Sequence, residues 1–387
     1  MSTIGKLFQT TTFGESHGAA VGCVIDGCPS GIRLCISDMQ TQVDRRRPGT
    51  SIIASQRSEA DRIQIVSGVL STEDPDVLVT LGTPICMIAK NLDTRSIDYE
   101  NTEFVPRPGH ADYTYDKKYG VRAVSGGGRA SARETLARVA AGAVAELVLK
   151  KEFPGLEITA WVSMVGSVRL TDPERFELNP PTKDQVDELG TVSVGESQRL
   201  AFTRCPDPET AAKMAHEIFS VKNAGDSIGG IVTCVVKGLP PGIGEPVFDK
   251  LTAELAKAMM SIPATRGFEM GKGFSACEMR GSCHNDLFRG DSVDGRLTTL
   301  TNYAGGVLGG ISSGMPLIFK VAFKPVSSIG LEQTTCNFIG EMTTLKVSGR
   351  HDPCVVPRCP PIVEAMTALV LCDLVLRQKR NKHCDWK

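Results

Sequence analysis

Three of the six histidines lie in polar segments rich in glycine or arginine and are the first candidates for chemistry. His17 stands in a Gly-rich turn, His110 follows a Pro-Gly pair, and His351 precedes Asp352. An imidazole ring titrates near neutral pH, so it suits the protonation of a leaving group or of a bound cofactor. Asp352, beside basic neighbours, is expected to be ionised and able to accept a proton. We therefore predict a polar active site built around His17 and His110.

The turn that holds His17 also matches G-x-S-x-G, the pattern of a serine-hydrolase nucleophile elbow. That elbow requires a strand before the serine and a helix after it. Residues 20–25 instead have the composition of a strand, and the same pattern recurs at 310–314. A hydrolase with Ser16 as nucleophile stays open as an alternative, but the turn favours His17 as its active member.

Arginines form the second group of candidates. Arg45, Arg46 and Arg47 are consecutive, and Arg107 lies three residues before His110. Guanidinium groups bind phosphate and carboxylate oxygens in pairs. Because the whole chain has a formal net charge of −1, this local clustering predicts a site for a small anion. A non-catalytic protein that binds RNA or another polyanion through the three consecutive arginines stays open, although the interleaved aromatic residues of such a surface are missing.

A Gly-rich segment at 125–133 leads into the clearest predicted helix and carries Arg129, Ser131 and Arg133. Glycines permit close approach of the backbone to a ligand, and the free N–H groups at a helix start favour an anion. The segment has neither the Rossmann nor the Walker pattern. It therefore predicts an anion contact outside the common nucleotide-binding classes.

The composition bounds the class of protein. The chain has 387 residues, with 41% hydrophobic and 22% charged residues, enough for a large core in two lobes or domains. Its thirteen cysteines contain no C-x-x-C pair, so we interpret them as reduced thiols and expect no metal site. The N-terminus lacks a leader pattern and no run of 18 apolar residues occurs, so we expect a cytoplasmic protein without a membrane partner.

Hydrophobic patterning predicts a chain of mixed α and β structure. Strands are expected at 6–8, 20–25 and 228–236, with further apolar runs at 63–70 and 77–90. Helices are expected from Ser37 or Asp38 to about Arg47, and at 131–151, 247–260 and 361–379. Residues 91–128 predict a long irregular loop, which is usually functional, and residues 171–197 a polar surface excursion.

One internal similarity suggests duplicated halves. Gly68-Val69-Leu70 followed by Gly82-Thr83-Pro84-Ile85 resembles Gly306-Val307-Leu308 followed by Gly314-Met315-Pro316-Leu317. The two segments would be corresponding hairpins, although chance similarity between Gly-rich strands is an equally good explanation.

Taken together, seven segments resemble the chorismate synthase family in their order along the chain. They are TTFGESHG at 11–18, DRRRPG at 44–49, RPGHADY at 107–113, GGGRASARET at 126–135, GGVLGGISSG at 305–314, KPVSS at 324–328 and GRHDPC at 349–354. The resemblance runs from Ile4 to about Leu376. It implies an α+β fold, a β-α-β sandwich of antiparallel sheets and helices with pseudo-duplicated halves. It also implies a single catalytic domain over residues 1–387, with a peripheral tail from about 377, and a homotetramer.

The resemblance further implies a lyase of the shikimate pathway. Members of this family eliminate phosphate in a trans-1,4 reaction from 5-enolpyruvylshikimate 3-phosphate and give chorismate. The reaction requires reduced FMN without net redox change, and NADPH is a candidate reductant of that flavin. The substrate carries a phosphate and two carboxylates, which agrees with the clustered arginines of a chain that is nearly neutral overall.

The same resemblance assigns roles to individual residues. His17 would protonate the leaving phosphate, His110 would support the reduced flavin, and Asp352 would take the flavin N5 proton. The substrate-binding positions are Arg46, Arg107 and Arg133, with Arg57 as a further candidate. The implied FMN contacts are Arg129, Ala130, Ser131, Pro263, Ala264, Gly309, Lys324, Pro325, Val326, Ser327, Ser328 and Arg350.

Two positions depart from the family pattern. Ile52 stands where many bacterial members have an arginine near the substrate or NADPH, and Arg57 is the candidate to serve the same region. Pro263 replaces an asparagine common in bacterial members, so only its backbone is available to contact FMN.

Overall fold

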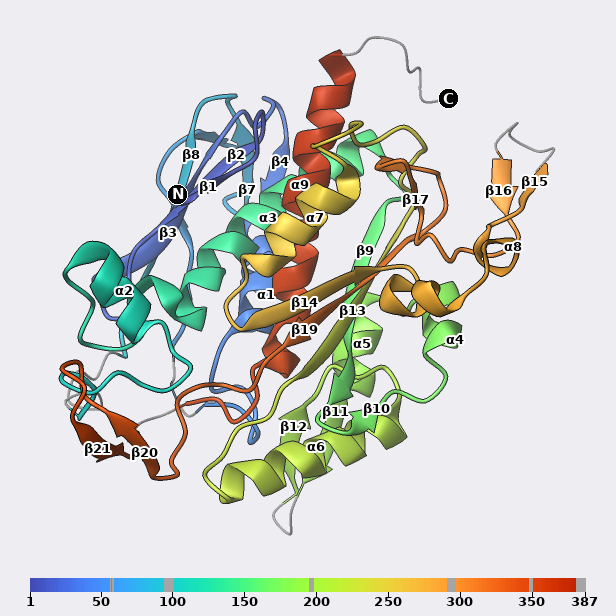
Figure 1. Ribbon diagram of the computed structural model, residues 1–387. Coiled ribbons are helices and arrows are strands. Elements are labelled where there is room, and N and C mark those ends of the chain that lie inside the picture. Colours follow the sequence, from blue (N-terminus) through green and yellow to red (C-terminus); the bar gives the residue numbers. More distant parts are fainter. Residues whose placement is uncertain are drawn as a thin grey trace.

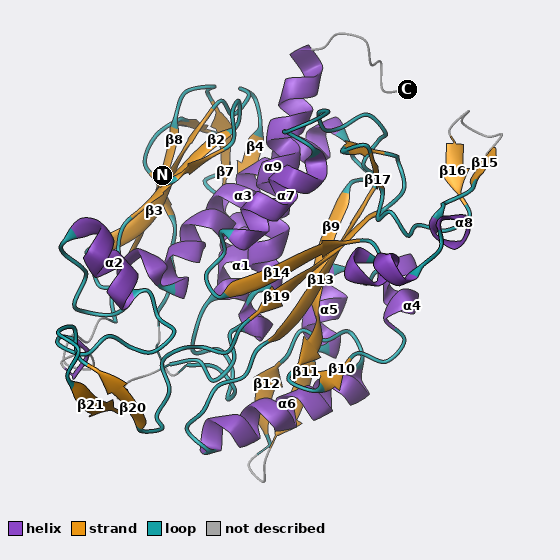
Figure 2. Ribbon diagram, in the orientation of Figure 1, coloured by secondary structure: helices purple, strands orange, loops and turns teal. Residues whose placement is uncertain are grey.

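The computed structural model describes residues 1–55, 57, 59–93, 101–194, 198–290, 297–347 and 351–380. In this part of the chain, two five-stranded antiparallel sheets flank a layer of long helices (Figure 1). The mixture of helices and strands in these layers is plain in Figure 2. The predicted α+β sandwich is confirmed.

The first sheet has the strand order β1-β2-β3-β8-β5. Its strands are Thr3–Ile4 (β1), Gln9–Phe13 (β2), Ala20–Asp26 (β3), Ile85–Lys90 (β8) and Gln64–Ile65 (β5). Along β8 the buried residues Ile85, Met87 and Ala89 alternate with more exposed ones, as expected for a sheet covered on one face. A smaller sheet, β4-β7-β6, contains Arg33–Cys35, Val77–Thr80 and Val69–Ser71.

The strand predicted at residues 6–8 is wrong, because the strand there begins at Gln9. The backbone N–H groups of Lys6, Leu7 and Phe8 all donate to one carboxylate oxygen of Asp373, at 2.8, 2.6 and 3.0 Å. Backbone donors that are spent on a side chain cannot also pair with a neighbouring strand.

The second sheet has the order β10-β9-β13-β19-β14. Its strands are Val168–Arg169 (β10), Glu157–Val165 (β9), Gly230–Lys237 (β13), Leu317–Phe323 (β19) and Thr265–Met270 (β14). The central strand β13 is buried along most of its length, which explains its continuous apolar sequence. The strand predicted at 228–236 is confirmed, with ends shifted by one or two residues.

Four helices fill the space between the two sheets: α1 (Ile36–Arg46), α3 (Thr135–Glu152), α7 (Leu251–Met260) and α9 (Pro360–Arg380) (Figure 1). All four were predicted, with two shifted starts. Val247 has φ +65°, a left-handed conformation that a helix cannot contain, so α7 starts four residues later than expected. Two 3-10 turns, Gly128–Ala130 and Ala132–Glu134, precede α3 where a regular helix was expected from residue 131.

The two halves of the chain repeat one order of elements. The sequence β3-α1-β5-β8-α3 in the first half recurs as β13-α7-β14-β19-α9 in the second. The spatial order β2-β3-β8-β5 likewise recurs as β9-β13-β19-β14. Two copies of one antiparallel unit therefore face each other across the shared helices.

The two Gly-rich segments singled out in the sequence occupy equivalent places in these halves. Gly68 and Gly306 have φ values of +80° and +81°. A Cβ atom on Gly68 would lie 2.6 Å from the carbonyl oxygen of Pro84, and one on Gly306 would lie 2.4 Å from that of Pro316. The same close approach at both places confirms that the segments are corresponding hairpins.

The remaining elements lie around this sandwich. The helices are α2 (Asp112–Tyr119), α4 (Pro173–Leu178), α5 (Lys183–Leu189), α6 (Pro208–Asn223) and α8 (Gly281–His284). The strands are β11 (Thr191–Val194), β12 (Arg199–Phe202), β15 (Phe288–Gly290), β16 (Leu297–Thr299), β17 (Val307–Leu308), β18 (Ile311–Ser312), β20 (Gln333–Cys336) and β21 (Met342–Leu345). The predicted loop at 91–128 thus contains α2, and the predicted excursion at 171–197 contains α4, α5 and β11.

The twelve cysteines in the described residues are free thiols, and most of them are buried. Within the same residues, none of the helices has the length and apolar character needed to cross a bilayer.

The packing of α3 on α9 generates a prediction about Gly142. A Cβ atom at this position would lie 2.4 Å from the Cβ of Ala365 on α9, although glycine is a poor helix former. Gly142→Ala should therefore destabilise the protein by about 1–3 kcal/mol through overpacking, despite alanine's higher helix propensity. Urea denaturation measures this change in the free energy of unfolding. Gly155→Ala is the control, because nothing lies within 4 Å of that site. An equal or higher stability of the Gly142 variant would contradict the packing.

Candidate active site

A cavity of about 1280 Å³ opens beside the 3-10 turns that precede α3. Its wall combines the start of the chain, α2, residues 261–266, residues 324–328 and the first turns of α9. Small-molecule sites usually have volumes of about 300–1,000 Å³, so this cavity has room for more than one ligand. The predicted site residues that line it are Arg46, Arg57, Arg107, His110, Arg129, Ala130, Ser131, Arg133, Pro263, Ala264, Lys324, Pro325, Val326, Ser327, Ser328 and Asp352.

Two predicted site residues are placed differently. His17 is not among the residues that line the cavity; it packs on Gly126, the neighbour of the cavity-lining Gly127, since a Cβ atom on Gly126 would lie 2.3 Å from its Nδ1. Gly309 does not line the cavity; with Gly310 it forms the tight turn between β17 and β18, where both residues have positive φ. Arg350 lies outside the described residues.

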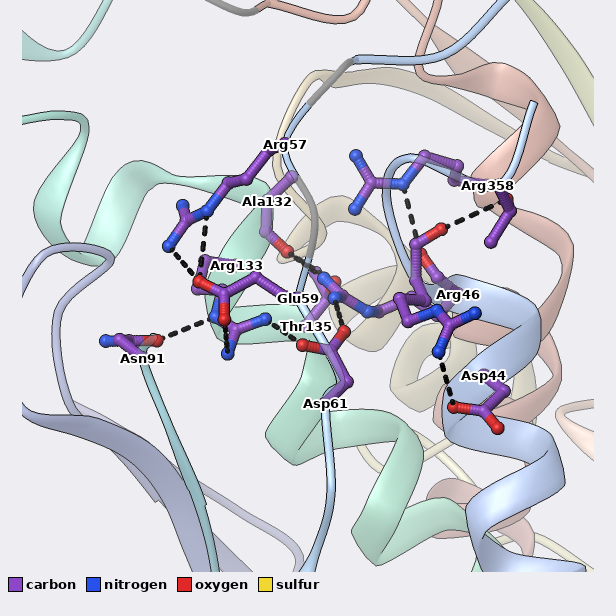
Figure 3. A network of polar contacts seen from close by, with 12 residues as sticks. Asp44, Arg46, Arg57, Glu59, Asp61, Asn91, Ala132, Arg133, Thr135 and Arg358 are labelled. Atoms are coloured by element: carbon purple, nitrogen blue, oxygen red, sulfur yellow. Dashed lines mark hydrogen bonds and ion pairs between the residues drawn. The ribbon is translucent and has the colours of Figure 1, made fainter. Parts of the chain in front are cut away.

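One buried carboxylate holds two of the predicted substrate arginines together (Figure 3). Asp61 receives a hydrogen bond from Arg46 on one oxygen, at 2.5 Å, and from Arg133 on the other. The side chains of Asp61 and Arg46 are completely buried, and that of Arg133 is 2% exposed. Two like-charged guanidinium groups can share this wall because the carboxylate stands between them.

Burial and charge act in opposite directions on this group. Burial favours the neutral form of Asp61, but the charges of Arg46 and Arg133 and their hydrogen bonds outweigh it, so the pKa of Asp61 lies below its usual value. Burial also lowers the pKa of Arg46, to about 10, against the opposing attraction of Asp61. Asp61 and Arg46 are therefore both ionised at neutral pH.

A second carboxylate extends the network toward His17 (Figure 3). Glu59 accepts hydrogen bonds from Arg57 at 2.7 and 3.2 Å and from the backbone N–H groups of residues 92 and 93. The same guanidinium of Arg57 donates to the carbonyl oxygen of Ser16 at 3.2 Å. Arg57 therefore connects the acidic network with the turn that carries His17.

Arg133 directs each of its three side-chain nitrogens at a protein acceptor. Its Nε donates to Asn91 at 2.7 Å, its Nη1 to Asp61, and its Nη2 to the carbonyl oxygen of Lys90 at 3.2 Å. Such an arrangement makes Arg133 first of all a support for Asp61 and Arg46.

His110 belongs to a separate polar cluster around the carboxylate of Asp112, at the start of α2. Asp112 accepts hydrogen bonds from Arg107 Nε and Nη2, each at 2.8 Å, and lies 2.8 Å from His110 Nδ1. These hydrogen bonds and the nearby positive charges overcome the effect of burial and hold the pKa of Asp112 well below its usual range. Arg107 Nη2 also donates to the carbonyl oxygen of Gly126 at 3.1 Å. Because Gly126 packs on His17, this arginine links the surroundings of the two histidines.

The fold brings residues from the second half of the chain to this cluster. Arg107 donates to Ser328 Oγ at 3.2 Å. Lys324 Nζ and Ser327 Oγ both donate to the carbonyl oxygen of Gly109 at 2.7 Å. Burial and the nearby charge of Arg266 lower the pKa of Lys324. In the described residues no carboxylate forms an ion pair with Lys324 or Arg266, so this side of the cavity carries positive charge that the protein leaves uncompensated.

Asp352 reaches the cavity from the segment before α9. One of its oxygens accepts from the backbone N–H of Ser55 at 2.7 Å, and the other pairs with Arg358. Arg358 also donates to the carbonyl oxygen of Arg46 at 3.0 Å. Arg358 is therefore a charged partner of Asp352 among the described residues.

The two alternative functions lose their structural basis. Arg45 pairs with Glu364 and Asp187 inside the protein, and Arg46 is completely buried. Only Arg47 of the three has a substantially exposed side chain (37%), so the arginine tract does not form the cluster of exposed cations that an RNA surface needs. Ser16 is 1% exposed and lies between β2 and β3, a strand-turn-strand context that lacks the helix of a nucleophile elbow.

Sequence reasoning missed the carboxylates that organise this site. Asp61 and Glu59 follow the arginine tract without a motif of their own, and only their acidic type next to so many arginines gave a signal. Asp112 was easier to identify from the sequence, since it stands two residues after His110 within one of the quoted segments.

The fold and the cavity bring arginine, histidine and carboxylate side chains together around a space large enough for small molecules. The chorismate synthase family model matches residues 8–376. The chain is 50% identical to the chorismate synthase of Schizosaccharomyces pombe, covering 98% of this chain and 97% of that one, and 49% identical to that of Synechococcus elongatus, covering 100% and 99%. A crystal structure of a chorismate synthase superposes with a TM-score of 0.72 at 28% identity, over 97% of this chain and 93% of that one. The chain belongs to the chorismate synthase family, and it is a lyase.

The buried carboxylate between two arginines generates a prediction about stability. Asp61→Asn should lower the free energy of unfolding at neutral pH by about 3–5 kcal/mol, because it leaves buried guanidinium charge uncompensated. Asparagine tolerates the left-handed backbone that Asp61 adopts (φ +49°), so the loss reports charge and not strain. Asp38→Asn, at an exposed site on α1, is the control and should change stability by less than about 0.5 kcal/mol.

The pH dependence of this difference follows from the depressed pKa of Asp61. The stabilisation is complete above the unfolded value of about 3.9 and is lost as the pH falls through the lower folded value. Denaturation of both proteins across this range should therefore show the difference shrinking in acid. A difference that stays constant down to the lowest pH would contradict an ionised Asp61.

Proposed function

We propose that this enzyme catalyses the trans-1,4 elimination of phosphate from 5-enolpyruvylshikimate 3-phosphate to give chorismate, with reduced FMN as cofactor. The observation that carries the proposal is a cavity lined by arginines and by His110 in a chain about 50% identical to chorismate synthases over its whole length. A substrate with one phosphate and two carboxylates meets in this wall the guanidinium groups that bind such oxygens in pairs.

The residues present fit a reduced flavin as well as the substrate. The cavity volume exceeds that of a typical single-ligand site. The proposed flavin contacts in the cavity come from three separate segments, residues 129–131, 263–264 and 324–328, and they include the uncompensated Lys324. Bound reduced flavin supplies electron density to the reacting substrate without net oxidation. The protein positions it and excludes water.

Individual side chains receive the following roles in this proposal. Arg46, Arg57 and Arg107 bind the anionic groups of the substrate, and Arg133 holds Asp61 and Arg46 in place. His17 donates the proton to the leaving phosphate from its place behind Gly126. Its Nδ1 lies 3.1 Å from Ser16 Oγ, so the hydroxyl group helps to hold the ring. Asp352, fixed by Ser55 and Arg358, accepts a proton at the cavity wall.

We further propose that the enzyme is a homotetramer of single-domain subunits that works in the cytoplasm without nucleic-acid or membrane partners. One buried core cluster extends from Phe8 to Val375, which supports a single domain. Free thiols agree with a reducing compartment. Large apolar side chains such as Phe274 and Phe288 are exposed on the described chain, and contact between subunits would cover them.

The proposed roles of the histidines predict the effect of removing them. His17→Ala and His110→Ala should each fold normally and lose about 10²–10⁴-fold in the rate of chorismate formation, the range of general acid–base groups. The assay supplies 5-enolpyruvylshikimate 3-phosphate and reduced FMN anaerobically and follows chorismate. His216→Ala, at an exposed site on α6, is the matched control and should keep the wild-type rate. Rates near wild type in the first two variants would show that both rings are structural.

NADPH is the reductant that we propose for the flavin. Ile52 replaces an arginine of many bacterial relatives, but Lys222 Nζ donates to the Ile52 carbonyl oxygen at 2.5 Å and so supplies a cation beside it. Arg57 adds a second cation in the cavity wall. NADPH with oxidised FMN should therefore sustain chorismate formation in air without an added reductase. Turnover that occurs only with flavin reduced beforehand would contradict this part of the proposal.

A further inference from the structure

Asp112 has no role in the function proposed above, yet its carboxylate is saturated with hydrogen bonds. One oxygen, Oδ2, accepts from Arg107 Nε at 2.8 Å and from the backbone N–H of Arg107 at 3.1 Å. The other, Oδ1, accepts from Arg107 Nη2 at 2.8 Å and lies 2.8 Å from His110 Nδ1. The side chain of Asp112 is 5% exposed and that of His110 is 17% exposed. The carboxylate thus stands between the histidine and the protein interior.

His110 Nδ1 has two near neighbours, and they require opposite states of the ring. If Nδ1 carries a hydrogen, it donates to Asp112 Oδ1. If it is unprotonated, it accepts from Arg107 Nη2, which lies 3.1 Å away. A donor-only guanidinium and an acceptor-only carboxylate cannot both be satisfied by the same ring nitrogen.

Counting hydrogens decides between the two states. Arg107 Nη2 carries two hydrogens, and two other acceptors are in place for them, Asp112 Oδ1 at 2.8 Å and the Gly126 carbonyl oxygen at 3.1 Å. No hydrogen of Nη2 is then left for the ring. An unprotonated Nδ1 would moreover face the ionised carboxylate at 2.8 Å, lone pair against lone pair.

We propose that Asp112 is a positioning residue for His110. When the His110 ring is neutral, Asp112 keeps its hydrogen on Nδ1 and leaves Nε2 for the ligand in the cavity. Asp112 fixes the ring through Oδ1 and fixes Arg107 through both oxygens. One carboxylate therefore sets the orientations of two cavity-lining side chains, those of His110 and Arg107. Among the described residues, Nε2 has no hydrogen-bond partner in the protein. The nitrogen that meets the ligand is therefore an acceptor in the neutral ring and a donor in the charged ring.

The tautomer is open to direct measurement without substrate or flavin. Histidine side-chain ¹⁵N spectra of the full chain distinguish a protonated ring nitrogen from an unprotonated one at a pH where the rings are neutral. The signal of His110 is the one lost in His110→Gln. We expect a protonated Nδ1 and an unprotonated Nε2 in the wild type. The reverse pattern in the wild type would overturn the proposal.

Variants test whether Asp112 causes this preference. Removing Asp112 alone leaves Arg107 buried without its carboxylate, so the pair Arg107→Met with Asp112→Ala removes both charges together. In this double variant, His110 should lose the Nδ1–H form. Asp116→Asn, one helical turn after Asp112 and paired with Lys117 instead of His110, should leave the His110 spectrum unchanged. A protonated Nδ1 that persists in the double variant would show that another group sets the tautomer.

The consequence for catalysis rests on the proposed function and has its own readout. Asp112→Asn should reduce the rate of chorismate formation about 10–100-fold, as is common when the partner that orients a functional histidine is changed. In the His110→Ala background, the same substitution should have a smaller effect, because only the part that acts through Arg107 remains. An unchanged rate in Asp112→Asn, with an active wild type, would contradict the positioning role. If the wild type makes no chorismate at all, the proposed function fails while the ¹⁵N result still decides the tautomer.

Discussion

Several arginines reach the cavity from buried positions, and a charged group cannot be buried without a partner. Asp61 stands between Arg46 and Arg133, and Asp112 backs Arg107 and His110. These carboxylates do more than cancel charge. Each one fixes the plane of a guanidinium group by hydrogen bonds, and the bidentate pairing of Arg107 with Asp112 leaves that side chain a single orientation. The geometry of the cavity wall therefore depends on Asp61, which lies behind it, and on Asp112, which is part of it.

As a result, the positive charge of the cavity wall is neutralised in one part of the cavity and not in another. Asp61 forms ion pairs with Arg46 and Arg133, and Asp112 forms one with Arg107, so these cations of the wall are largely neutralised. Lys324 and Arg266 have no carboxylate partner among the described residues. Arg46, Arg107 and Arg133 come from the first half of the chain, Lys324 and Arg266 from the second, and the helices between the two sheets hold the halves together. Arg358, also from the second half, is paired with Asp352.

The sequence predicted the parts of this protein that depend on local pattern. The helices α1, α3, α7 and α9 follow from apolar spacing, and most of the site residues predicted from the family resemblance line the cavity. Pattern could not reveal contacts between distant residues. Nothing near residues 6–8 announces that Asp373, more than 360 positions away, takes their backbone donors in place of a strand. For the same reason Asp61 was not recognised from the sequence, since its importance comes from two arginines on other elements.

The central claim is that this cavity binds a phosphorylated dicarboxylate and removes its phosphate by elimination. The most direct measurement incubates the wild-type protein anaerobically with 5-enolpyruvylshikimate 3-phosphate and a small amount of reduced FMN, and quantifies both products and the flavin. We expect chorismate and inorganic phosphate in equal amounts, over many turnovers, with the flavin still reduced at the end. Phosphate released without chorismate, or no release by folded protein, would contradict it.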